Sequence, residues 1–162
     1  MPSVDLVDET FIAAAPARIA SVVADRRRWE QWWPDLRLTV FMDRGHKGIR
    51  WSVAGRFVGS AEIWIEPAFD GAIVHYYLRL DPTPTVVDVT TDRTSPSAVS
   101  ARSTSKVSNH QAARIRGRRA KSWKRIVWAL KDELESGREP GMPATTPDAA
   151  TSARSGPVEV GQ

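Results

Sequence analysis

Apolar and polar residues alternate along most of the chain between residues 36 and 80, and this period of two constrains the fold more than any other feature. Glycine, proline and aspartate divide the alternation into four segments, which predict strands around residues 36–43, 49–53, 61–66 and 72–80. Consecutive strands joined by short turns form an antiparallel sheet, and a sheet with one apolar face needs other elements to cover it. The pattern therefore predicts an α+β fold.

The covering elements are predicted on both sides of this region. A strand over 4–12 is followed by a helix over 16–24, which Pro16 starts, and by a short helix over 27–33, which Pro34 ends. Near the C-terminus, a helix over about 109–136 carries an apolar stripe at spacings of three and four. The stripe consists of Ala120, Trp123, Val127, Leu130 and Leu134.

Length and composition predict one compact domain over residues 1–137 of the 162. Residues 81–108 are predicted as a long loop or irregular strands, and 138–162, which are rich in Pro, Gly, Ala, Thr and Ser, as a disordered tail. Without cysteine there can be neither a disulfide nor a thiolate metal site. The first residues lack the pattern of a signal peptide and no apolar run is long enough for a membrane span, so we expect a cytoplasmic protein.

The stretch from Asp25 to Pro34 places Trp29, Trp32 and Trp33 beside a charge cluster, directly after the first predicted helix. This arrangement resembles the START-like (SRPBCC) superfamily and, within it, the polyketide cyclase/dehydrase and lipid-transport families. The resemblance implies a helix-grip fold, in which a curved antiparallel sheet wraps around a long C-terminal helix and encloses an apolar cavity. It further implies that the cavity binds a hydrophobic small molecule such as a lipid or a polyketide.

The alternation and the helical stripe identify the side chains that would line such a cavity. The resemblance adds Trp29 and Trp33 at its entrance, and the Tyr76 hydroxyl could orient a ligand oxygen. The predicted lining comprises Val40, Trp51, Val53, Ile63, Val74, Tyr76, Trp123 and Val127.

Arg116 continues the helical stripe toward the N-terminus, with Arg119 at its edge. A guanidinium in an apolar interior needs a carboxylate, a bound anion or a route to solvent. Arg116 is therefore predicted either as a clamp for a ligand carboxylate or phosphate, or as a solvated residue where the helix extends beyond the sheet.

The same helix carries the excess positive charge of a chain whose net charge is +4. Its seven cations between Arg114 and Arg125 are uninterrupted by any acid, and Trp128 lies off the apolar stripe. This pattern favours a solvated face, with an anionic membrane surface or a protein partner as alternatives. The absence of a zinc signature, RNP motif or aromatic platform disfavours nucleic acid.

Catalytic signals are sparse. The three histidines, His46, His75 and His110, show no triad order or metal-ligand spacing, and no glycine-rich phosphate loop is present, so no cofactor or metal is predicted. The parity of His75 points it away from the cavity. The alternative to simple binding is a polyketide cyclase or dehydratase in which Tyr76 performs acid–base chemistry.

Overall fold

The computed structural model describes residues 2–83 and 108–137 of the chain. The elements in these ranges follow one another as the alternation and the helical stripe predict. They are β1 (Val4–Ile12), α1 (Pro16–Val23), α2 (Arg26–Trp32), β2 (Arg37–Asp43), the short 3-10 helix η1 (Gly45–Lys47), β3 (Gly48–Ala54), β4 (Phe57–Ala68), β5 (Gly71–Pro82) and α3 (Asn109–Glu135).

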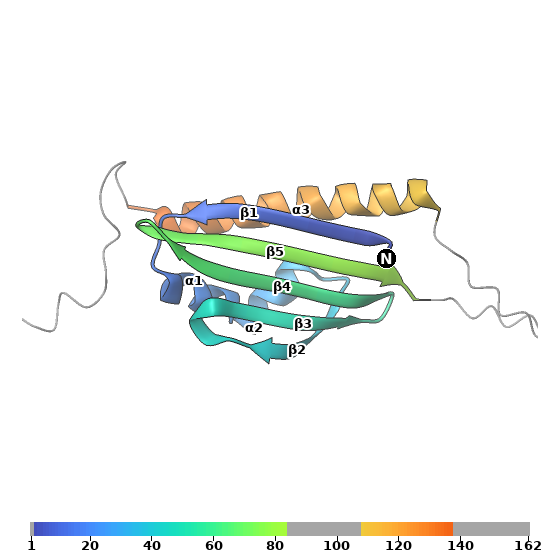
Figure 1. Ribbon diagram of the computed structural model, residues 1–162, viewed down its shortest axis with the longest axis horizontal. Coiled ribbons are helices and arrows are strands. Elements are labelled where there is room, and N and C mark those ends of the chain that lie inside the picture. The colour runs from blue at the N-terminus through green and yellow to red at the C-terminus, as the bar shows by residue number, and fades with distance from the viewer. Residues whose placement is uncertain (1, 84–107, 138–162) are drawn as a thin grey trace, which may run out of the picture.

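The five strands form one antiparallel sheet in the order β1-β5-β4-β3-β2. The first strand therefore pairs with the last one, and Tyr76 on β5 lies between Asp8 on β1 and Ile63 on β4. Figure 1 shows α3 running beside β1, while α1 packs against β3 and β4. The predicted α+β, helix-grip arrangement of an antiparallel sheet with a long C-terminal helix is confirmed.

Each helix begins where the sequence supplies a start signal. Pro16 occupies the first turn of α1, where its missing N–H costs no hydrogen bond. The Asp25 carboxylate caps α2 by accepting from the Arg27 N–H at 3.0 Å, and the Ser108 hydroxyl caps α3 by accepting from the Gln111 N–H at 3.2 Å.

The core lies between the inner face of the sheet and the three helices. The predicted stripe of α3 is confirmed in its C-terminal half, where Trp123, Val127, Leu130 and Leu134 are buried. Lys131 fixes the same part of the helix to β1, because its ammonium donates to the Phe11 carbonyl at 2.9 Å. Burial of each large apolar side chain contributes about 1.5–3 kcal/mol, so packing rather than helix propensity holds α3 in place.

Two details differ from the sequence prediction. The hairpin predicted over 67–71 is tighter, because β4 continues to Ala68 and only Phe69 and Asp70 separate it from β5. In β2 a regular alternation over 36–43 would place Met42 on the same inner face as Val40, but the register shifts between these two residues, so Met42 lies opposite the outward-facing Arg50.

The long loop predicted over 81–108 falls largely outside the described residues, as does the predicted tail over 138–162, and both stay predictions. None of the helices in the described ranges has the length and hydropathy needed to span a membrane.

Candidate functional site

Three aromatic rings from different elements stack in the space where the sequence predicted a ligand cavity. Tyr76 on β5 and Trp123 on α3 lie face to face with ring centroids 3.9 Å apart. Trp33, at the C-terminal end of α2, is parallel to both, at 5.8 Å from Tyr76 and 6.3 Å from Trp123. All three side chains are buried, so these rings fill the space between sheet and helix by contacting one another.

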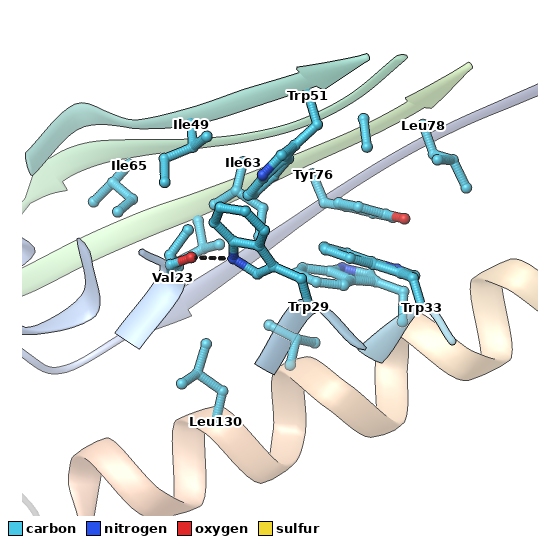
Figure 2. Close-up of a cluster of buried hydrophobic side chains, with 14 of the residues drawn as sticks. Val23, Trp29, Trp33, Ile49, Trp51, Ile63, Ile65, Tyr76, Leu78 and Leu130 are labelled. Atoms are coloured by element: carbon cyan, nitrogen blue, oxygen red, sulfur yellow. Dashed lines mark hydrogen bonds between the residues drawn. The ribbon is translucent and has the colours of Figure 1, made fainter. Parts of the chain in front are cut away.

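A second aromatic contact closes the interior beside this stack. Trp29 and Trp51 meet edge to face at 5.2 Å, and Figure 2 shows the nitrogen-bearing edge of Trp51 turned toward the Trp29 ring. Within the described ranges, the Trp51 N–H has no hydrogen-bond acceptor. The Trp29 N–H donates to the Val23 carbonyl at 2.6 Å.

The Tyr76 hydroxyl is part of this packed interior. Desolvation raises the pKa of Tyr76 far above its ordinary value, while the positive charge of Arg119 and a hydrogen bond with the Trp33 side chain oppose the shift more weakly. A phenol with a raised pKa keeps its proton at neutral pH and is a weaker acid than free tyrosine. These properties suit a structural hydroxyl better than an acid–base catalyst.

The remaining predicted lining residues divide into two groups. Those on the central strands and on α3 are buried in the same core as the rings, and their role toward a ligand stays a prediction. They are Val53, Ile63, Val74 and Val127.

Val40 and Arg116 lie outside the interior. Val40 therefore does not line it, contrary to the prediction, and the exposed position of Arg116 agrees with the second of its two predicted alternatives, a solvated residue. Val40 pairs with the inward-facing Trp51, yet it is 43% exposed because β2 is the edge strand of the sheet. Arg116 is exposed on α3. The covered side of the first half of α3 passes through Ile115 and Arg119, because the helix there faces Asp35 and Phe57, at the start of β4, and no longer β1.

An open cleft lies at this first half of α3. Its volume is about 820 Å³, and its walls come from three parts of the chain: the helix, the β3–β4 turn and the loop after α2. The lining contains six permanent cations, one acid and two large apolar side chains. The lining residues are Asp35, Arg56, Phe57, His110, Gln111, Arg114, Ile115, Arg118, Arg119, Lys121, Ser122 and Arg125.

Arg119 is the fixed cation of the cleft. Its guanidinium donates to both oxygens of Asp35, at 2.9 and 2.5 Å, and lies 5.5 Å from the centre of the Phe57 ring. These hydrogen bonds hold the pKa of the Asp35 carboxyl below its ordinary value. Asp35 is the one acid in the lining, and its hydrogen bonds go to Arg119, so one acid stands against six cations there.

Arg114, Arg118 and Lys121 are three of the available cations. All three are exposed, and none forms an ion pair with another of the described residues. Their spacing along α3 places them on one side of the helix together with Gln111 and Arg125. A sequence search for a polar stripe beside the apolar one would have found this set, which the sequence analysis treated as a solvated face.

The outer face of the sheet holds His75, as its parity predicted. His75 is nonetheless buried, because Trp64 stacks on its ring at 4.6 Å and Tyr77 lies parallel at 6.4 Å. Its two ring nitrogens contact the carboxylates of Glu9 at 3.2 Å and Glu66 at 2.9 Å. Over the described ranges, no three His, Asp or Glu side chains are placed to hold a metal ion.

No protein-family model matches the sequence, and no curated protein is significantly similar to it. Solved structures do match. The Aha1 dimer of Colwellia psychrerythraea aligns with a TM-score of 0.49 and 15% identity, over 84% of this chain and 99% of that one.

Two further matches carry names of the families that the sequence resembles. A START superfamily protein of Mycobacterium smegmatis aligns with a TM-score of 0.42 and 13% identity, over 81% of this chain and 97% of that one. A polyketide-cyclase-like protein of Corynebacterium glutamicum aligns with a TM-score of 0.45 and 17% identity, over 81% and 91%. These identities and TM-scores are low, so the function must be inferred from the site itself.

Proposed function

We propose that this protein binds an amphipathic small molecule with an anionic group, in the cleft between α3 and the β3–β4 turn. One observation carries the proposal: the cleft gathers six cations around an apolar floor, and its one acid is already paired with Arg119. A cleft of this volume is large enough for a ligand of drug or lipid-chain size.

The two kinds of lining residue suit the two ends of such a ligand. Phe57 and Ile115 offer apolar surface for a hydrocarbon or aromatic body. Arg114 and Arg118 offer guanidinium groups, which bind carboxylates and phosphates through paired hydrogen bonds. The predicted hydrophobic ligand, a lipid or a polyketide, is retained as the apolar part, but we assign it to the cleft and not to the aromatic interior.

The alternatives of the sequence analysis have less support. A cyclase or dehydratase needs a proton donor or acceptor at the ligand, whereas Tyr76 is buried in the ring stack. A membrane or protein contact through the whole basic helix would involve Arg116 as well, whereas the cleft gathers Arg114, Arg118, Lys121 and Arg125 and leaves Arg116 outside its lining.

The test compares dodecanoate with dodecanol by titration calorimetry, using the full chain. We expect dodecanoate to bind more tightly, and the double variant Arg114→Gln/Arg118→Gln to weaken its binding by about 1.5–3 kcal/mol, the scale of hydrogen bonds to charged groups. Binding of dodecanol should change little, because the apolar floor is intact.

Arg116→Gln is the matched control. It removes the same charge from the same helix, but Arg116 is absent from the lining of the cleft. An unchanged affinity for dodecanoate in this variant supports the cleft. An equal loss in Arg116→Gln and in single Arg118→Gln would contradict the proposal and indicate non-specific attraction to the helix.

A further inference from the structure

The outer face of the sheet, on the other side from the core, brings aromatic and cationic side chains together. In Figure 1 the strands β4 and β5 pass in front of α1 and α2, so this face is turned toward the reader. Arg50 on β3, Glu62 on β4 and Tyr77 on β5 lie directly opposite one another across the three strands. Residues paired in this way share a face of the sheet, so their side chains meet there.

A pocket of about 440 Å³ lies at this meeting point, and we call it the outer pocket. Three arginines, one acid, two aromatic residues and a serine line it. Its volume is within the range of small-molecule sites. It shares no lining residue with the cleft at α3, so the two are separate sites.

The charge of the outer pocket favours an anion. Glu62, its one acid, accepts from the Arg44 guanidinium at 2.6 Å, and its second oxygen lies 3.8 Å from Arg50 Nε. Arg79 lies 3.6 Å from Asp5 on β1, which is too far for a hydrogen bond. Three cations therefore stand against one acid in the lining, and Arg50 and Arg79 have N–H groups to donate to a ligand.

The remaining lining residues suit a planar ligand. Within the described part of the chain, the hydroxyls of Ser60 and Tyr77 have no hydrogen-bond partner, so both can donate to an anion. Trp64 and Tyr77 are half-buried, and both rings border the pocket. Because Trp64 stacks on His75 at 4.6 Å and Tyr77 lies parallel to His75 at 6.4 Å, these rings are held in nearly parallel planes before a ligand arrives.

We propose that the outer pocket is a second ligand site, for a small planar aromatic molecule that carries a carboxylate or a phosphate. Arg50 and Arg79 bind the oxyanion, while Trp64 and Tyr77 contact the aromatic part. The cleft at α3 offers one aromatic ring, that of Phe57, so the two sites select different ligands.

Titration calorimetry on the full chain compares 1-naphthyl phosphate and 1-naphthoate with the neutral 1-naphthalenemethanol. We expect both anions to bind more tightly than the alcohol, and the tighter of the two identifies the preferred oxyanion. The double variant Arg50→Gln/Arg79→Gln should raise the dissociation constant of the anions at least about tenfold, because two charged donors are lost. Its circular dichroism spectrum shows whether it is folded.

Two further comparisons keep the test independent of that variant. Arg79→Gln alone, at a side chain that is 60% exposed, should raise the dissociation constant of the anions at least about threefold. Decahydro-1-naphthyl phosphate has the same charge and a similar size but no aromatic ring, so it should bind about threefold or more weakly than 1-naphthyl phosphate.

Arg37→Gln is the matched control, because Arg37 is exposed on the same face of the sheet but is absent from the lining. It should leave the binding of 1-naphthyl phosphate unchanged. Arg114→Gln/Arg118→Gln should also leave it unchanged, whether or not the cleft at α3 binds dodecanoate.

Three outcomes would overturn the proposal. One is a failure of both anions to bind more tightly than the alcohol. Another is full affinity for 1-naphthyl phosphate in Arg50→Gln/Arg79→Gln together with a loss in Arg114→Gln/Arg118→Gln, which would place the ligand in the cleft at α3. The third is equal affinity for the aromatic phosphate and its saturated analogue.

Discussion

Arg119 on α3 donates two hydrogen bonds to Asp35 in the loop after α2, and this ion pair joins the helix to the opposite wall of the cleft. The Arg119 side chain is 13% exposed, so Asp35 supplies the charge partner that a nearly buried guanidinium requires. The pair fixes one cation of the cleft and leaves Arg114, Arg118 and Lys121 available.

Asp35→Asn should lower the free energy of unfolding by about 0.5–1 kcal/mol, because one side of a partly exposed but bidentate pair is removed. Denaturant unfolding followed by circular dichroism measures the change. Glu30→Gln is the matched control, since Glu30 is exposed and forms no ion pair with the described residues, and its effect should stay within about 0.5 kcal/mol. Equal effects of the two substitutions would show that the Asp35 pair contributes nothing specific.

The free energy of unfolding should fall in acid, because two carboxyl groups have lowered pKa values in the folded protein. Hydrogen bonds from Arg119 lower the pKa of Asp35, and hydrogen bonds from Arg28 lower the pKa of Glu133. Since the folded pKa values lie below the unfolded value of about 4, their contribution is complete above that pH and is lost as the pH falls through the folded values. The stability difference between the unaltered chain and Asp35→Asn should therefore shrink below about pH 4. A difference that stays constant down to low pH would exclude the ion pair as its origin.

The aromatic stack should dominate the stability of the helix–sheet contact. Trp123→Ala should cost about 3–5 kcal/mol, because it removes the ring against Tyr76 and Trp33 and leaves a cavity. Trp128→Ala, on the same helix but 55% exposed, should change the stability by less than about 0.5 kcal/mol. Urea midpoints of the two variants provide the comparison. A small effect of Trp123→Ala would mean that the stack is loosely packed.

Two glycine substitutions should change the stability of the fold in opposite directions. Gly48 begins β3 with φ at +108°, and a Cβ atom there would lie 2.0 Å from the Ile63 carbonyl oxygen. Gly48→Ala should therefore destabilise the fold by at least about 1–3 kcal/mol. Gly117 lies within α3 with nothing near its missing side chain, so Gly117→Ala should raise stability by about 0.5–1 kcal/mol. Thermal melts distinguish the two, and a stabilising Gly48→Ala would contradict the strand geometry described for β3.

Local periodicity predicted the elements and most of the interior. The alternation around Trp51, Ile63 and Tyr76 places each on the inner face, because side-chain direction in a strand depends only on parity. Val40 shares that parity, but its exposure depends on which strand lies at the edge. Strand order is set by pairing between distant segments, so it cannot be predicted from a local sequence pattern.

The cleft could not be predicted from the periodicity of the helix either. Periodicity gives the direction of Arg116 relative to Trp123, but not which surface lies opposite each turn of α3. That surface changes from β1 to Asp35 and Phe57 along the helix, so the covered side moves to Ile115 and Arg119. The cations of α3 were visible in the sequence, whereas the opposite wall comes from segments more than fifty residues away.

The pairing of β1 with β5 has a consequence for the order in which the molecule assembles. β3, β4 and β5 each join a strand that directly precedes them, but Val4 meets Leu80, and the Phe11 carbonyl meets Lys131. Closing such long loops is entropically costly and slow, so local hairpins form first. During synthesis β1 therefore waits for β5, and the part of the inner face that α3 covers stays exposed until α3 has left the ribosome.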